Sequence, residues 1–283
     1  MSPNDPRITP ARPDLAAKHL EGKVQAARFV EGALFEVVAP QAPVRREPRP
    51  DGLLDSEALK GERVMVYERN AEGWSWGQLL DDGHVGWIPT DALSAPVAEP
   101  THRIKALRTL VFPGPSVKMP PTEALSLGCR LSIARVEGPF AVSTTGGFVP
   151  LIQLAACGTM EPDFVGVAER FLGVPYLWGG KTSFGLDCSA LVQLSLNACG
   201  HPCLRDSDMQ EETLGSPIGP LADFSKLKRG DLVFWPGHVA IARDSETLIH
   251  ANGHHMAVAI EPILEAVERN RAMGFDTPSA KRL

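Results

Sequence analysis

Two stretches of the sequence repeat one pattern of short strands and turns, which restricts the first half of the chain to small all-β folds. Residues 61–93 and 128–154 each begin at a glycine and continue with alternating apolar residues. Each then reaches Gly, an aromatic residue, a β-branched residue and Pro, with Leu four residues after that Pro. Short alternating strands between Asp-Gly or Gly-Gly turns are typical of small β-barrels. We therefore predict one barrel over residues 34–97 and a second over residues 98–158.

The segment before the first barrel, residues 1–33, mixes prolines with charges of both signs. The sequence allows one helix in it, from Ala16 to Glu31, and indicates no role for it. The segment lacks the roughly 7 to 15 apolar residues of a signal peptide. No run of about 18 apolar residues follows elsewhere in the chain. We therefore expect a cytoplasmic protein with no membrane span.

A different pattern begins near residue 159 and predicts an α+β domain over residues 159–283. Apolar residues at helical spacing run from Phe164 until Gly173 ends the helix. Antiparallel strands after helices are typical of an α+β domain. The predicted later elements are a helix from Ser189 to Cys199, strands at 232–235, 238–242 and 247–251, and a last helix around Pro262 to Glu268.

Charge and cysteine content exclude several classes of partner and cofactor. The net charge of −6 and the pI of about 5.8 would repel nucleic acid and anionic membranes. Five cysteines, an odd number, favour reduced thiols over a disulfide framework. Cys199, His201 and Cys203 lie too close together to surround a tetrahedral zinc ion, and no second half-site follows. We predict no metal, no cofactor and no nucleic-acid partner.

One cysteine has the surroundings of a nucleophile. Cys188 follows Asp187, a good N-cap residue, so it lies in the first turn of the predicted helix. Helix N-termini lower the pKa of a thiol, so we expect the pKa of Cys188 to be lowered. By itself the position fits a plain buried cysteine equally well. His238 begins one strand and His250 ends the next, and these two imidazoles favour a catalytic site.

Five motifs together carry a family resemblance that spans residues 162–270: Tyr176 to Gly180, Asp187 to Val192, Gly230 to Trp235, Gly237 to Ile241 and Ile249 to Ala251. The NlpC/P60 cysteine peptidases are similar to this chain in the order and spacing of all five motifs, and the repeated barrels resemble bacterial SH3 domains. The resemblance implies a multidomain protein with two small SH3-like all-β barrels followed by an α+β papain-like domain.

The resemblance also implies roles for the residues at these motifs. Cys188 would be the nucleophile, His238 its base and His250 the residue that orients the base. Tyr176 would help to stabilise the oxyanion. Enzymes of this family cut the peptides of bacterial cell walls, so the implied activity is that of a cysteine peptidase.

Two SH3-like modules before the peptidase domain are similar to a narrower group, the γ-D-glutamyl-L-diamino acid endopeptidases. This group implies a murein tripeptide or tetrapeptide substrate with a free N-terminal L-Ala, in the recycling of cell-wall peptides. Asp206 and Ser207 match the substrate-binding pair of the group. Trp178, Asp187 and Ser189 are further candidate substrate-binding residues.

The first SH3-like module departs from the pattern of this narrower group. In that group a Tyr in the turn between two strands and an upstream acidic residue close one side of the cleft. Here His84 stands where Tyr is usual. The acidic residue is Asp55 or Glu57, and the sequence does not decide between them. These two departures concern how the substrate amine is recognised, not the chemistry of the thiol.

Other interpretations stay open at this point. Trp178 fits a core position as well as a place in the site, whereas Trp87 and Trp235 are expected in the core. His254 and His255 are expected in a solvated turn. The same three catalytic residues could serve an amidase or acyltransferase, because an amine or alcohol can also discharge a thioester. A non-catalytic protein that binds wall peptides is a third alternative, which the intact Cys, His and His residues disfavour.

Overall fold

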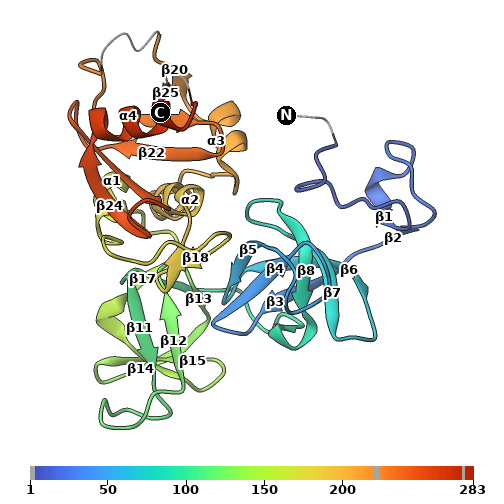
Figure 1. The fold of residues 1–283 in the computed structure, drawn as a ribbon. Helices are drawn as coiled ribbons and strands as arrows, with labels where there is room; N and C mark the ends of the chain where they lie inside the picture. Colours follow the sequence, from blue (N-terminus) through green and yellow to red (C-terminus); the bar gives the residue numbers. More distant parts are fainter. Residues whose placement is uncertain (1–3, 220–223, 276–277) are drawn as a thin grey trace. The chain divides into compact units, whose positions relative to one another are not determined.

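The computed structural model describes residues 4–219, 224–275 and 278–283 of the chain (Figure 1). The described residues divide into two compact units, one that ends at Thr159 and one from Met160 to Leu283. The first unit contains the β-rich segment of the repeat, and the second contains the predicted α+β segment. Within the described part of the chain, no helix combines the length and apolar character needed to cross a membrane.

The first barrel is built on one antiparallel sheet of seven strands, in the order β5-β4-β8-β7-β6-β3-β9. Alternation places Val44, Val64, Leu79 and Ile88 in its core, each at most 1% exposed. The elements are β3 (Ala33–Val37), β4 (Gln41–Arg45), β5 (Leu54–Leu59), β6 (Arg63–Arg69), β7 (Trp74–Leu79), β8 (Val85–Pro89), the 3-10 helix η2 (Thr90–Ala92) and β9 (Leu93–Ser94).

The helix predicted from Ala16 to Glu31 is wrong. The segment instead forms two short parallel strands, β1 (Ala16–Ala17) and β2 (Phe29–Val30), and a single 3-10 turn, η1 (Lys18–Leu20). Gly22 has a φ of 79°, a left-handed conformation that ends any helix there.

Tertiary contacts with the first barrel favour this extended form of the N-terminal segment. Leu15 is completely buried against the tryptophan cluster of the barrel, which includes Trp74, Trp76 and Trp87. The guanidinium of Arg12 stacks over the Trp76 ring at 4.4 Å from its centroid. The segment therefore contributes to the packing of the first barrel.

The second β-rich module has three small sheets, ordered β13-β10-β17, β11-β12 and β14-β15-β16. Its repeat segment forms a strand, a 3-10 turn and a strand, as β8, η2 and β9 do in the first barrel. That this module is a second SH3 domain stays a prediction. Its elements are β10 (His102–Ile104), β11 (Arg108–Val111), β12 (Glu123–Ser126), β13 (Arg130–Leu131), β14 (Ile133–Glu137), β15 (Phe140–Ser143), β16 (Phe148–Pro150), η3 (Leu151–Gln153) and β17 (Leu154–Ala156).

The second unit is an α+β domain around a six-stranded antiparallel sheet, ordered β20-β25-β21-β22-β23-β24. The three strands predicted from the sequence are present, and the helix of the thiol begins at Cys188 rather than Ser189. The elements are α1 (Phe164–Glu169), β18 (Lys181–Thr182), β19 (Gly185–Leu186), α2 (Cys188–Ala198), α3 (Ser207–Thr213), β20 (Ser216–Pro217), β21 (Leu232–Trp235), β22 (His238–Ala242), β23 (Thr247–Asn252), β24 (Ala257–Pro262), α4 (Ile263–Ala272) and β25 (Ser279–Arg282).

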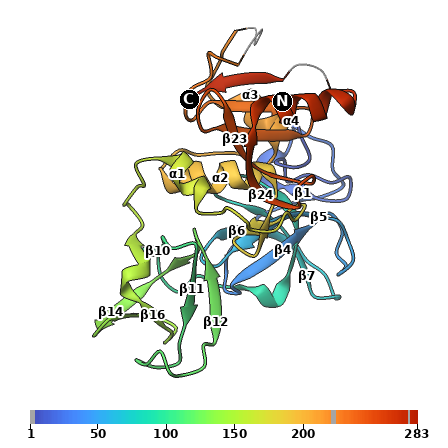
Figure 2. The same ribbon diagram turned by 60° about the vertical axis from the view of Figure 1, so that its left-hand side comes forward.

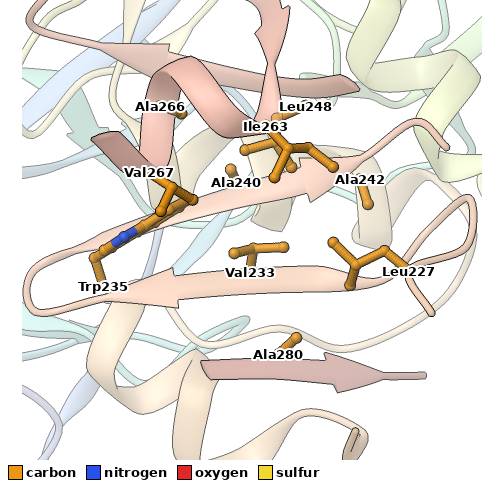
Figure 3. Packing of buried hydrophobic residues seen from close by; sticks show 10 residues of the cluster. All are labelled: Leu227, Val233, Trp235, Ala240, Ala242, Leu248, Ile263, Ala266, Val267 and Ala280. Atoms are coloured by element: carbon orange, nitrogen blue, oxygen red, sulfur yellow. The ribbon is translucent and has the colours of Figure 1, made fainter. Parts of the chain in front are cut away.

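Helices hold the central strands of this sheet in place. Figure 3 shows the α4 side chains Ile263 and Val267 in one buried cluster with Val233 and Ala240 of the sheet. Helix α2 packs against β22 and β23, and α1 lies beside α2 (Figure 2). Burial of each large apolar side chain contributes about 1.5–3 kcal/mol to stability. The ends of β22 and β23, which carry the two predicted catalytic histidines, are therefore set on a rigid layer.

Candidate active site

The first turn of α2 positions the thiol of Cys188. Asp187 is the N-cap, and its carboxylate accepts hydrogen bonds from the backbone N–H groups of Ala190 and Gly179, each at 2.9 Å. The cap satisfies a free N–H group of the helix start and fixes the direction of the chain there. Cys188 is thus held on a defined turn, as the sequence predicts.

A buried arginine that was not among the predicted site residues completes this turn. Arg205 is 1% exposed and donates to both carboxylate oxygens of Asp187, at 2.9 and 2.7 Å. It also donates to Ser189 Oγ at 2.9 Å. Asp187 and Ser189 therefore hold Arg205 beneath the first turn of α2, and their direct contact with a substrate stays a prediction. The sequence signal for this contact was Arg205 itself, because an arginine at a buried position needs a carboxylate partner.

The pKa of the Cys188 thiol is shifted upward, whereas the helix N-terminus was expected to lower it. Burial raises the pKa of Cys188 to about 12, and the carboxylate of Asp187 adds to this effect. The sulfur accepts a hydrogen bond from the backbone N–H of Val239, the residue after His238, but this bond does not outweigh burial. The prediction of a lowered pKa is wrong because desolvation depends on tertiary packing. The resting thiol is protonated.

The two predicted histidines are hydrogen-bonded to each other. His238 lies at the start of β22 and His250 near the end of β23, and the distance from His238 Nε2 to His250 Nδ1 is 2.7 Å. Burial, together with the nearby His250, lowers the pKa of His238 to about 3. His238 is therefore a neutral imidazole at neutral pH, as a general base must be.

An acid and an arginine that sequence reasoning missed extend this chain of contacts. His250 Nε2 lies 2.6 Å from Glu261 Oε1, and Arg269 donates to the two oxygens of Glu261 at 2.5 and 2.7 Å. Glu261 is on β24, where Leu248 is its direct partner on β23, so it faces His250 diagonally. An acid in an otherwise apolar strand was the signal that could have indicated it.

Tyr176 has the properties of a hydrogen-bond donor near the thiol. Burial raises its pKa to about 12, with further contributions from the charges of Cys188 and Asp187. Its hydroxyl therefore stays protonated and can donate. The backbone N–H of Tyr176 donates to Met256 O at 3.0 Å, which ties the residue to the turn between β23 and β24.

The remaining candidates of the second unit are found at accessible positions. Trp178 is 66% exposed, which excludes the core interpretation for this residue, whereas Trp235 is 3% exposed and belongs to the core as predicted. Asp206 is the N-cap position of α3 and Ser207 its first residue, and both are partly exposed. His254 and His255 are exposed in their turn, as expected.

The candidates of the first barrel lie on two of its segments. Asp55 and Glu57 are on β5, and Asp55 forms an ion pair with Arg46 at 2.8 Å. His84 lies between β7 and β8, is 2% exposed, and its backbone N–H donates to Asp82 Oδ1 at 3.0 Å. Their part in binding a substrate amine stays a prediction. Trp87, expected in the core, is 9% exposed within the tryptophan cluster.

In the described ranges, no group of three or more His, Cys, Asp or Glu side chains is arranged to hold a metal ion.

Comparison with known families finds one match in each unit. Residues 173–276 match the NlpC/P60 family, and residues 44–93 match the SH3 domain of bacterial dipeptidyl-peptidases. A solved NlpC/P60 family protein from Bacillus cereus shares the fold, with a TM-score of 0.70, 20% identity, and coverage of 82% of this chain and 94% of that one.

Curated relatives include several peptidases. The γ-D-glutamyl-L-lysine dipeptidyl-peptidase of Bacillus subtilis is 30% identical over 203 residues, or 65% of each chain. The protein of the same name from Bacillus cereus is 24% identical over 244 residues, 74% of this chain and 71% of that one. Dipeptidyl-peptidase 6 of Lysinibacillus sphaericus is 35% identical over 90 residues, 32% of each chain. The chain thus matches less than two thirds of the length of two of these three relatives.

Proposed function

Because residues 173–276 belong to the NlpC/P60 family of cysteine peptidases, we propose that this protein is a cysteine peptidase that hydrolyses peptides derived from peptidoglycan. The observation that carries the proposal is the thiol on the first turn of α2, next to a strand that begins with a neutral imidazole. That imidazole has a hydrogen-bonded partner behind it at 2.7 Å. This is the combination of nucleophile, base and orienting group that acyl transfer by a thiol requires.

In the first half of the reaction, the thiol attacks the carbonyl carbon of the scissile amide. His238 takes the proton of Cys188 as the S–C bond forms, and the carbonyl oxygen becomes an oxyanion. The backbone N–H of Cys188, at the helix start, and the hydroxyl of Tyr176 are the proposed donors to this oxyanion. When the tetrahedral species collapses, the C–N bond breaks and His238 returns the proton to the leaving amine.

In the second half, water discharges the thioester. His238 removes a proton from the water as its oxygen bonds to the acyl carbon. The C–S bond then breaks, and the proton passes from His238 to the sulfur, which regenerates the thiol. The neutral resting state of both groups suits this route, since each half begins with an unprotonated base.

We further propose that the bond cut lies between γ-D-Glu and the diamino acid of a murein tripeptide or tetrapeptide. The names of the Bacillus relatives support this choice, because each is a γ-D-glutamyl-L-lysine dipeptidyl-peptidase. A dipeptidyl-peptidase releases a dipeptide from a free N-terminus, so the substrate would carry a free L-Ala amine. Asp206 is the proposed acidic partner of that amine. A role in recycling wall peptides in the cytoplasm is part of the same proposal.

Mass spectrometry of the products from L-Ala-γ-D-Glu-diamino acid peptides tests the reaction. Cys188→Ala should abolish turnover, because the bond-forming atom is removed, while peptide binding stays within a few fold. Cys199→Ala, at the other end of α2, is the matched control and should keep full activity. Unchanged turnover by Cys188→Ala would refute the mechanism, and transfer of the dipeptide to an added amine without hydrolysis would indicate an acyltransferase.

The free amine is tested with an acetylated peptide. Removal of one partner from a desolvated charge pair costs about 2–5 kcal/mol, so N-acetylation of L-Ala should reduce kcat/KM roughly 30-fold or more. Asp206→Asn should lower kcat/KM for the free peptide more than for the acetylated one. Equal kcat/KM for the two peptides on the unmodified enzyme would contradict the amine pocket but leave the peptidase reaction standing.

A further inference from the structure

We propose that Glu261 and Arg269 are positioning residues that hold His250, and through it His238, in the tautomer whose Nδ1 is free to accept the thiol proton. The inference rests on the proposed role of His238 as base. It concerns two residues that lie behind the three predicted catalytic groups and do not touch the thiol.

The direction of the hydrogen bonds follows from Glu261. Glu261 is 5% exposed and accepts two hydrogen bonds from Arg269, so the two side chains form an ion pair within the domain. Burial alone would raise the pKa of Glu261, but hydrogen bonds from His250 and Arg269 outweigh burial and lower it to about 2. An ionised carboxylate can only accept. At the 2.6 Å contact, His250 Nε2 must therefore be the donor.

The remaining protons are then fixed one after another. A neutral imidazole carries one N–H, so His250 with its proton on Nε2 has a lone pair on Nδ1. That lone pair faces His238 Nε2 at 2.7 Å, so His238 Nε2 must donate. A neutral His238 with its proton on Nε2 has its lone pair on Nδ1. The second ring nitrogen, which faces away from His250, is thereby left free to act as the base.

The same chain of bonds works only while His250 is neutral. If His250 were protonated, both of its nitrogens would donate, and the proton of His238 would have to move to Nδ1. Burial lowers the pKa of His250, while Glu261 acts in the opposite direction. The positive charge of Arg269 and the neighbouring His255 also lower the pKa of His250.

His238 experiences a similar set of charges. After burial, His250 and Arg269 lower its pKa, whereas Glu261 and Asp187 raise it. Arg269 therefore has two effects: it keeps Glu261 ionised, and it opposes the protonation of both imidazoles. Glu261 supplies the acceptor, and Arg269 prevents that acceptor from drawing a second proton onto His250.

Two substitutions separate these effects in the pH profile of kcat/KM. Glu261→Leu removes the acceptor but leaves the cation, so kcat should fall about 10- to 100-fold at all pH values, the factor that one hydrogen bond to a charged group represents. Arg269→Met leaves the acceptor but removes the cation, so the pKa of His250 should rise. The acid limb of kcat/KM should then move to higher pH, and kcat above that limb should fall less than in Glu261→Leu.

The tautomers can be observed directly by multiple-bond ¹H–¹⁵N spectra of histidine-labelled full-length protein, recorded without substrate. We expect His250 and His238 to carry their protons on Nε2 in the unmodified protein, and Glu261→Leu to abolish this single pattern. A proton on Nδ1 of either residue in the unmodified protein would overturn the proposal. So would a Glu261→Leu protein with unchanged kcat. The spectra are recorded without substrate, so they test the tautomers independently of activity. If the unmodified protein failed to cut murein peptides, that result would count against the proposed function alone.

A matched control comes from a second buried acid with a bidentate arginine in the same domain. Asp231 is 1% exposed and accepts from Arg282 at 2.7 and 2.6 Å, away from the imidazoles. Arg282→Met should change neither the pH profile nor the tautomers. If Arg282→Met reproduces the shift of Arg269→Met, the effect is a general loss of a buried pair and the proposal is refuted. If Glu261→Leu does not fold, the pH profile of Arg269→Met and the spectrum of the unmodified protein still test the proposal.

Discussion

Removal of the Arg205 guanidinium should destabilise the peptidase unit and disturb the first turn of α2. Loss of one partner from a buried ion pair costs about 3–5 kcal/mol, since the other charge is left uncompensated. In Arg205→Met, the carboxylate of Asp187 would keep the backbone N–H donors of Gly179 and Ala190. This residual support places the expected loss of unfolding free energy at the lower end, about 3 kcal/mol, which is more than a hundredfold in the folding equilibrium.

A chain with two compact units does not have to unfold in one two-state step, so one overall transition would not report on the peptidase unit alone. Hydrogen–deuterium exchange of peptides from residues 160–283 at increasing urea concentration isolates the relevant midpoint. Arg282→Met is the comparison, because Arg282 also binds a buried carboxylate but its own side chain is 41% exposed. It should shift the midpoint less than Arg205→Met. A loss below about 1 kcal/mol in Arg205→Met, or one no larger than in Arg282→Met, would refute the role assigned to this pair.

Three further predictions concern titration, thiol reactivity and the N-terminal segment. The pKa of His238 falls from 6.5 in the unfolded chain to about 3 in the folded one, so its contribution to stability is lost as pH falls through this range. For the same reason the acid limb of kcat/KM should lie below pH 6. An acid limb at pH 6.5 or above, measured with a peptide substrate that is itself stable at these pH values, would contradict this. Burial also raises the pKa of Cys188 and of Cys129 to about 12, so iodoacetamide should modify both more slowly at pH 8 than a model thiol, and rapid labelling of Cys188 at pH 6 would instead favour an ion pair. Leu15→Ala should cost the first unit about 2–5 kcal/mol in urea unfolding, because Leu15 is fully buried, and an unchanged midpoint would show that the N-terminal segment is not part of the barrel.

Local patterns predicted the elements of the fold where short-range chemistry decides them. The Gly, aromatic and Pro pattern predicted the strands at 85–89 and 148–150, because turn residues and alternation act within a few positions. The strands at 232–235 and 238–242 were predicted for the same reason. The N-terminal helix was wrong because Leu15 and its neighbours are buried by a barrel that lies later in the sequence. In this segment, tertiary burial outweighs the local helix propensity.

The candidate site divides in the same way. Cys188 could be placed from its cap, and His238 and His250 from the ends of two consecutive strands that pair. Glu261 and Arg269 could not be placed, since their contacts depend on the register of β24 against β23 and on the position of a helix on the sheet. The direction of the shift in the pKa of the thiol was predicted wrongly, because the effect of the helix end is local whereas desolvation depends on all the side chains packed around the sulfur.

An ion pair with a buried carboxylate lies behind each of the two groups proposed for catalysis. Arg205 and Asp187 hold the turn that carries the thiol, and Arg269 and Glu261 hold the imidazoles. A buried ion pair adds little stability compared with apolar residues of similar volume, because desolvation of the charges offsets their attraction. Apolar residues at these positions would fill the space equally well but could not fix a hydrogen-bond direction. We infer that the two pairs are present for orientation: one sets where the sulfur lies, and the other sets which nitrogen of the base is free to take its proton.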